Sequence, residues 1–176
     1  MSPDAFVQMA YQLTYFRLHK QMVSTYESSM VKHFIHGRTE CVRSATSDVK
    51  RFVESFDDKS LDAETRKGLL RAATERHVVE MKKSKEGKLV DRHMQGLNWL
   101  SKQQLYRQAG YQRPTLFTDP SFATHFASIL STSNCGSNAL DHFSFGPVCG
   151  NGYGLGYMIK DDNIPISVTN FQGKSA

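Results

Sequence analysis

The sequence changes character between Gly110 and Pro114, and this change constrains the fold more than any other feature. Before it, apolar residues recur every three or four positions, which is the period of an amphipathic helix. After it, short β-prone runs are separated by Gly, Asn and Asp, as in strands joined by turns. Helices followed by strands indicate an α/β or α+β arrangement. We therefore predict a mixed β-sheet with flanking helices, helix-rich over residues 1–110 and strand-rich over 115–176.

The first helix is expected to begin at Pro3. Ser2 suits the N-cap, Pro3 suits the first helical position, and Asp4 complements the positive end of the helix dipole. Periodicity predicts three more helices, at residues 47–56, 62–85 and 89–108. Extended segments are expected at residues 24–30, 37–46, 126–134, 142–148, 152–159 and 164–171.

Charge and cysteine content exclude some classes of protein. The formal net charge is +5, but acidic residues are interspersed with the basic ones, so no nucleic-acid-binding arm is expected. Three cysteines without framework spacing favour free thiols in a reducing compartment. No apolar run approaches the ~20 residues of a membrane helix, so no transmembrane segment is expected. His33 and His36 lack a carboxylate partner, and no metal site is predicted.

The segment "STSN", residues 131–134, has two interpretations. Its hydroxyls could satisfy local backbone groups at a strand end. Alternatively, Ser131 and Ser133 point to one side of the strand and donate hydrogen bonds to a ligand, which the two-residue period of a strand permits. A nucleophile elbow is excluded because the G-x-S-x-G frame is missing.

Other polar motifs also have alternative readings. Arg92, in "VDRH", is either a solvated residue at a helix start or a guanidinium that clamps a carboxylate. The lysine-rich segment 82–88 is either an exposed loop or a phosphate contact. His77 is expected to be a packed core histidine. The glycines of 150–157 match a dinucleotide motif only loosely, and they are expected to mark turns and close backbone approach.

Taken together, seven stretches resemble, in order and spacing, the C-terminal part of the carnitine/choline acyltransferase family: "SPDAFVQMAYQLTYFRL", "TYESSM", "HGRTECVRSAT", "VDRH", "LSTSN", "FGPV" and "GYGLGY". The resemblance covers nearly the whole chain, residues 1–176. It implies acyl transfer between coenzyme A and the hydroxyl of carnitine, between two halves that resemble chloramphenicol acetyltransferase. The general-base histidine would lie in the N-terminal half, upstream of Met1, so this chain alone should be inactive.

The resemblance also assigns roles to individual residues. Tyr26, Thr39 and Arg92 match the residues that hold the carnitine carboxylate. Ser133 matches the donor to the tetrahedral oxyanion, Ser131 lies near carnitine, and Phe145 lies beside its trimethylammonium group. The matching coenzyme A contacts are Ser2, Pro3, Asp4, Ser28 and Asn134. Coenzyme A is implied as a co-substrate, without a tightly bound cofactor or metal, in mitochondria or peroxisomes.

Two positions bear on substrate choice within the resemblance. Thr39 and Arg92 favour carnitine over choline, because choline has no carboxylate. Phe143 stands where long-chain enzymes carry a small residue, and its ring should close the acyl tunnel, which favours an acetyl or other short group. Asn134 replaces the usual glutamine and Val78 replaces an arginine that contacts coenzyme A. An octanoyl or palmitoyl enzyme and a non-catalytic, truncated binding module are the alternatives.

Overall fold

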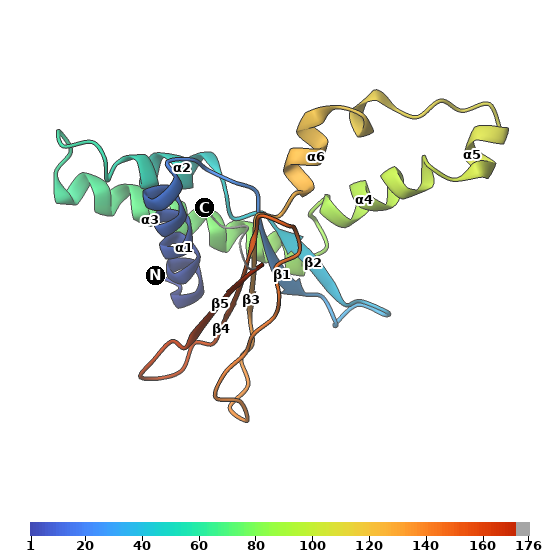
Figure 1. The fold of residues 1–176 in the computed structure, drawn as a ribbon. Helices are drawn as coiled ribbons and strands as arrows, with labels where there is room; N and C mark the ends of the chain where they lie inside the picture. Colours follow the sequence, from blue (N-terminus) through green and yellow to red (C-terminus); the bar gives the residue numbers. More distant parts are fainter. Residues whose placement is uncertain (172–176) are drawn as a thin grey trace.

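The computed structural model describes residues 1–171, and its centre is an open five-stranded sheet (Figure 1). The strand order is β2-β1-β3-β4-β5. β1, β3 and β4 run parallel in the middle, while β2 and β5 are antiparallel at the two edges. The predicted mixed sheet with flanking helices is therefore confirmed. The strands are β1 (Thr25–Met30), β2 (Thr39–Val42), β3 (Leu130–Asn134), β4 (Tyr153–Tyr157) and β5 (Ile166–Asn170).

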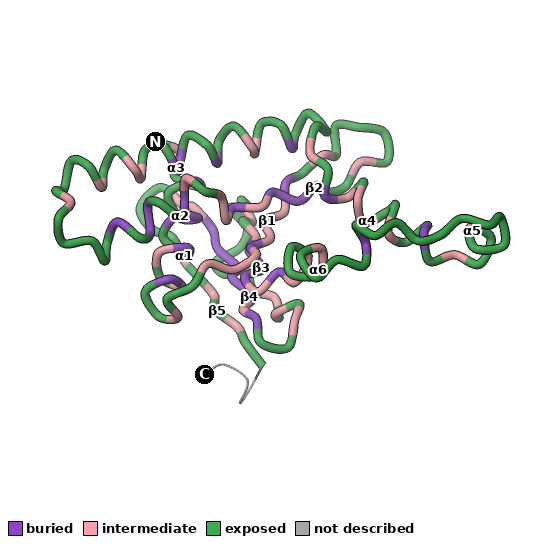
Figure 2. The backbone as a smooth tube through the Cα atoms, turned by 90° about the horizontal axis from the view of Figure 1, so that it is seen from above, coloured by how far each residue is buried: buried purple, intermediate pink, exposed green. Residues whose placement is uncertain are grey.

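The helices lie in two groups on either side of the sheet in Figure 1. The first group is α1 (Pro3–His19), α2 (Ser47–Glu54) and α3 (Ala63–Lys85), and the second is α4 (Asp91–Leu100), α5 (Gln104–Gln108) and α6 (Pro120–Phe126), with a short 3-10 helix at Thr115–Phe117. Figure 2 shows that the α4–α5 arm is mostly exposed, whereas α1, α2 and the strands carry buried segments. The core is therefore formed by the first group and the sheet.

Two apolar clusters form this core. One joins the three helices through Met9, Phe16, Val49, Phe52, Val53 and Ala73. The other packs α1 onto one face of the sheet through Val7, Tyr11, Leu130, Leu155 and Tyr157. Burial of apolar area, at about 25 cal/mol per Å², makes these clusters the main stabilising contacts between helices and sheet.

The two ends of helix α1 are determined by residues at or next to those ends. The side chain of Ser2 accepts a hydrogen bond from the Ala5 backbone N–H at 3.4 Å, and Pro3 occupies the first helical position, as predicted. The helix ends where Lys20 adopts a left-handed conformation with φ of 54°. The Lys20 N–H donates to the Phe16 carbonyl at 2.7 Å and so closes the last turn.

The two glycines of β4 allow another part of the chain to lie directly on the sheet. A Cβ atom at Gly154 would stand 2.5 Å from the carbonyl oxygen of Phe145, and one at Gly156 would collide with the carbonyl oxygen of Phe143. The close backbone approach predicted for these glycines is thus confirmed. The strand predicted at 142–148 is wrong, because this segment lies over β4 without a ladder of its own.

Other predicted boundaries need correction. The helix expected at 89–108 is two helices, because the chain after Leu100 tightens into a turn in which Gln103 N–H donates to the Leu100 carbonyl. The strand expected from Phe126 begins only at Leu130, since Phe126 ends α6 and Ser128 then takes a left-handed φ of 49°.

Two further findings bear on the composition. Cys41, Cys135 and Cys149 are free thiols, as their number and spacing predicted. Within residues 1–171, every helix is too short or too polar to cross a lipid bilayer.

Candidate active site

Hydroxyl side chains collect on the face of the sheet opposite α1. Along β1 and β3, alternate residues point to opposite sides, and Tyr26 is paired in register with Ser131. One step further along the same face, the Ser28 and Ser133 hydroxyls lie 3.1 Å apart. The prediction that Ser131 and Ser133 share one side of their strand therefore agrees with the structure, which adds Tyr26 and Ser28 beside them.

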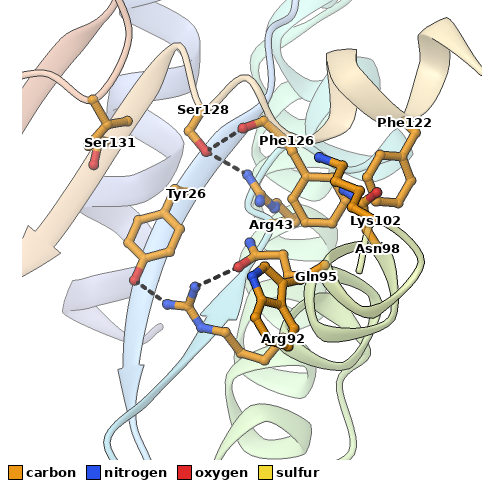
Figure 3. Close-up of a pocket in the computed structure, with 12 residues that line it drawn as sticks. Tyr26, Arg43, Arg92, Gln95, Asn98, Lys102, Phe122, Phe126, Ser128 and Ser131 are labelled. Atoms are coloured by element: carbon orange, nitrogen blue, oxygen red, sulfur yellow. Dashed lines mark hydrogen bonds between the residues drawn. The ribbon is translucent and has the colours of Figure 1, made fainter. Parts of the chain in front are cut away.

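Arg92, near the start of α4, reaches over this face to Tyr26 (Figure 3). Its guanidinium donates to the Tyr26 hydroxyl at 3.0 Å and to the Thr39 hydroxyl at 3.4 Å. The guanidinium carbon also lies 5.6 Å from the centre of the Tyr26 ring. Among the described residues, no carboxylate forms an ion pair with Arg92, so its charge is available to an anionic ligand. The three residues predicted to hold a carboxylate are thus brought together.

A buried ion pair fixes the start of α4. Arg43 donates to both carboxylate oxygens of Asp91, at 2.9 and 3.2 Å, and to the hydroxyl of Ser128 at 2.9 Å. Burial would raise the pKa of Asp91, but the hydrogen bonds and charge of Arg43 and then of His125 outweigh it, so this pKa lies below its ordinary value. Because Asp91 precedes Arg92, the pair sets where the Arg92 side chain begins. No local sequence pattern indicates this pair, because its two residues are 48 positions apart.

Arg92 and Tyr26 line a cavity of about 500 Å³ (Figure 3). Ser131 forms part of its wall, and the remaining wall combines aromatic rings with polar groups: Arg43, Gln95, Asn98, Trp99, Lys102, Phe122, Phe126, Ser128 and Val148. The cavity can hold a small molecule with an anionic group at Arg92 and an apolar or cationic group against the rings. The aromatic residues of α4 and α6 were not predicted as part of the site.

Two phenylalanines were predicted at the substrate, Phe145 beside the trimethylammonium group of carnitine and Phe143 at the acyl tunnel, and both lie elsewhere on the same face. The rings of Phe143 and Phe145 are 5.7 Å apart, in the segment that covers β4. The Phe143 ring lies against Gly156, where a Cβ atom would be 3.2 Å from it. Neither phenylalanine lines the cavity beside Arg92. The structure therefore places both phenylalanines next to the hydroxyl face, over β4.

A second cavity, of about 630 Å³, opens at the carboxyl ends of β1 and β3. It is lined by four of the five residues predicted to contact coenzyme A: Ser2, Asp4, Ser28 and Asn134. Pro3 is not among the lining residues. The Asn134 amide donates to the Asp4 carboxylate at 3.2 Å, which in turn accepts from the Tyr157 hydroxyl at 2.7 Å. These positions are therefore adjacent in space, although they are far apart in sequence.

Polar residues beneath this second cavity form a buried network that sequence reasoning missed. The carboxylate of Glu27 lies 2.6 Å from the His77 ring and accepts a hydrogen bond from Ser44 at 3.2 Å. Both ion-pair partners are almost fully buried. Burial raises the pKa of Glu27 above its ordinary value; burial lowers that of His77, but the bond to Glu27 outweighs this and the His77 pKa is also raised. His77 is a core histidine, as predicted, but an ionisable one.

Asp4, Glu27 and His77 place three possible metal-ligand atoms within 4.8 Å of one another. The Glu27–His77 contact and the Tyr157 bond to Asp4 already engage these atoms. The cluster is therefore explained by the hydrogen-bond network between α1, α3 and the sheet.

Comparison with known proteins assigns the family. All 176 residues match the family described as Choline/Carnitine o-acyltransferase. The chain is 36% identical to Carnitine O-acetyltransferase of Rattus norvegicus over 97% of its own length and 26% of the relative. It is 37% identical to Peroxisomal carnitine O-octanoyltransferase of Homo sapiens, with 95% and 27% covered, and 33% identical to mitochondrial Carnitine O-palmitoyltransferase 2 of Rattus norvegicus, with 100% and 26% covered. The chain thus spans about a quarter of the length of these relatives, and it belongs to the choline/carnitine O-acyltransferase family.

Proposed function

We propose that the protein carrying this chain transfers a short acyl group, preferably acetyl, between coenzyme A and the hydroxyl of carnitine. Residues 1–176 are proposed to be the C-terminal portion of its catalytic domain, acting together with an N-terminal half of the same polypeptide. The observation that carries the proposal is the junction of Arg92, Tyr26 and Thr39 beside a cavity that also contains Ser131.

The group formed by Arg92, Tyr26 and Thr39 suits the carboxylate of carnitine. A carboxylate leaving water needs charge-assisted donors, and the Arg92 guanidinium together with the Tyr26 and Thr39 hydroxyls would supply them. The aromatic wall of the cavity, including Trp99, suits the trimethylammonium group at the other end of carnitine, because such cations are attracted to ring faces. Phe145 is proposed to approach this group only when carnitine is bound.

Ser133 is proposed as the donor to the oxyanion. As the carnitine oxygen attacks the thioester carbonyl, negative charge collects on the carbonyl oxygen, and a hydroxyl held in place stabilises it. The Ser28 hydroxyl, 3.1 Å away, orients Ser133 toward the sheet face where the reacting groups meet. Ser131 lies two residues earlier, on the carnitine side. The lining of the carnitine cavity includes no histidine, and the general base is proposed to come from the N-terminal half.

The choice of acyl group is proposed from Phe143. Its ring lies on the hydroxyl face over β4, where it would limit the space beyond a bound acyl carbonyl. Overall identity does not decide this point, since acetyl, octanoyl and palmitoyl relatives are 36%, 37% and 33% identical to the chain. Mitochondria and peroxisomes, which appear in the names of the relatives, are the proposed compartments.

The test is acyl transfer by the full-length protein, with carnitine or choline as acceptor and acetyl-, octanoyl- or palmitoyl-coenzyme A as donor. Acetyl transfer to carnitine, with choline as a poor acceptor, is expected. In Phe143→Gly, the longer donors should gain kcat/KM relative to acetyl. A wild-type preference for octanoyl or palmitoyl donors would replace the acetyl proposal with a longer-chain one, and failure to acylate carnitine at all would refute the function.

A further inference from the structure

The wall of the second cavity includes two lysines, Lys82 and Lys85. Val78, Met81, Lys82 and Lys85 of α3 line one wall, at the spacing that places side chains on the same face of a helix. Within residues 1–171, neither Lys82 nor Lys85 forms a salt bridge or a side-chain hydrogen bond. The adjacent Lys83, by contrast, pairs with Glu80 at 3.1 Å.

The acidic residues of this cavity already have donors of their own. Glu27 contacts His77 at 2.6 Å, and Asp4 accepts hydrogen bonds from Tyr157 and Asn134. With about 1.5 Å of rise per helical residue, Lys82 and Lys85 lie roughly 7 and 12 Å along α3 from His77. The positive charge is therefore separated from the acidic end of the cavity.

A second observation points to a ligand. Ser29 is only 2% exposed and lines the cavity, yet its hydroxyl has no hydrogen-bond partner. Leaving a buried hydroxyl unpaired costs free energy, and a bound polar molecule would supply the missing hydrogen-bond partner. Ser29 follows Ser28 on β1, so its side chain lies on the same face as Glu27 and points away from the Ser28–Ser133 pair, on the side of the cavity that α3 forms.

The geometry of the cavity matches a long ligand with an anionic end. From Ser28, β1 continues to Met30, and the turn that follows brings the Phe34 ring against Gly87, just beyond the end of α3. The cavity therefore extends from the hydroxyl pair toward the C-terminal turns of α3. In coenzyme A, the pantetheine arm separates the thioester from the phosphate groups, which must consequently bind at a distance from Ser133.

We infer that Lys82 and Lys85 form an anion subsite that binds the phosphate end of coenzyme A, with Ser29 contacting the arm between phosphate and thioester. This inference rests on the proposed use of coenzyme A. The lysines would compensate for Val78, which occupies the first position of the same helix face and carries no charge. The lysine-rich segment is thereby divided into two ligand-facing residues, Lys82 and Lys85, and a structural residue, Lys83, which pairs within its helix.

The experiment measures binding of coenzyme A, dephospho-coenzyme A and pantetheine to the full-length protein by calorimetry. Replacing Lys82 and Lys85 by Gln should weaken coenzyme A binding about threefold to fivefold each and about tenfold or more together, because contacts at an open site are worth up to about 1 kcal/mol. The double variant should bind pantetheine as well as wild type does. If dephospho-coenzyme A shows the same loss, the diphosphate is the contacted group; if it shows none, the 3′-phosphate is.

Two control variants make the result specific. Lys83→Gln removes an equal charge from the same helix and should leave all three dissociation constants unchanged. Ser29→Ala should weaken coenzyme A and pantetheine equally, about threefold to tenfold, without lowering stability. If the double Lys82/Lys85 variant has the same dissociation constant for coenzyme A as Lys83→Gln, the proposed subsite is wrong. If the subsite fails in this way but the wild-type protein acylates carnitine, the proposed function stands. If the double variant binds coenzyme A more weakly but the wild-type protein does not acylate carnitine, the subsite stands and the proposed function is refuted.

Discussion

The face of the sheet under α1 and α3 carries Glu27 and Thr132, which are buried and hydrogen-bonded to side chains of these helices. On the opposite face, Tyr26 and Ser28, the neighbours of Glu27 in β1, line cavities. Strands β1 and β3 thus carry polar side chains on both faces of the sheet, because successive residues of a strand point to opposite faces. On the covered face, Glu27 and Thr132 are engaged by side chains of the helices and hold these helices in place. On the hydroxyl face, Tyr26, Ser28 and Ser133 are partly exposed and can be used by a ligand.

This difference between the two faces of the sheet predicts which substitutions change stability and which change activity. A residue of the covered face contributes to folding because its partner is buried with it. A residue of the hydroxyl face contributes little to folding, because water can replace its partner, and under the proposed function it contacts the substrate.

The largest effect is expected on the covered face. Glu27→Ala leaves the buried His77 without its partner, which should reduce the free energy of unfolding by about 3–5 kcal/mol. Urea unfolding measures this loss. Glu75→Ala, which removes an exposed carboxylate from α3, is the control and should change stability by less than about 0.5 kcal/mol. If the two variants are equally stable, the Glu27–His77 pair does not hold α3 to the sheet.

The next effect concerns catalysis on the hydroxyl face. Ser133→Ala should lower kcat about 100-fold to 1,000-fold through loss of an oxyanion donor, with little change in stability. The matched control is Thr132→Val, one residue away on the covered face. It removes the acceptor for the Gln8 amide at 2.9 Å and should cost about 1–3 kcal/mol of stability while preserving kcat. Similar kcat values for the two variants would contradict the division between faces.

A smaller effect is expected on substrate binding. Arg92→Ala should raise the KM for carnitine about tenfold to 100-fold, because hydrogen bonds to charged groups contribute about 1.5–3 kcal/mol. Arg92→Lys should recover only part of this, since an ammonium lacks the planar fork of donors. Arg107→Ala on the exposed α5 serves as the control. An unchanged KM for carnitine in Arg92→Ala would disprove the carboxylate contact.

The hydroxyl face could be predicted from sequence because its information is local. The two-residue period of a strand places Ser131 and Ser133 on one side, and the register of β1 with β3 then adds Tyr26. The N-cap at Ser2 and the close approach at Gly154 are likewise consequences of single residues. The family resemblance supplied what local patterns could not, namely which ligand such hydroxyls would meet.

The covered face could not be predicted because its pairs join distant residues. Glu27 and His77 are 50 positions apart in the sequence, and Gln8 and Thr132 are 124 positions apart. Neither pair therefore produces a local sequence pattern that would predict it. The segment 142–148 alternates like a strand, yet the Phe145 carbonyl accepts a hydrogen bond from the side chain of Thr169 in β5, at 2.6 Å, rather than from a backbone N–H. The helix α6 was missed although Asp119 and Pro120 form a recognisable helix start.

The smallest effect is a pH dependence of stability that originates on the covered face. The pKa values of Glu27 and His77 both lie above their ordinary values of 4.5 and 6.5, so the folded protein binds more protons there than the unfolded chain does. Stability from each group is complete below its ordinary pKa and is lost as pH rises through its raised, folded-state pKa. The free energy of unfolding should therefore fall as the pH rises from about 5 to about 8. Glu27→Gln removes one titrating group and the charge that raises the His77 pKa, so its unfolding free energy should decline less over this range. A wild-type stability that rises across this range, or an unaltered slope in Glu27→Gln, would show that the pair does not carry the titration.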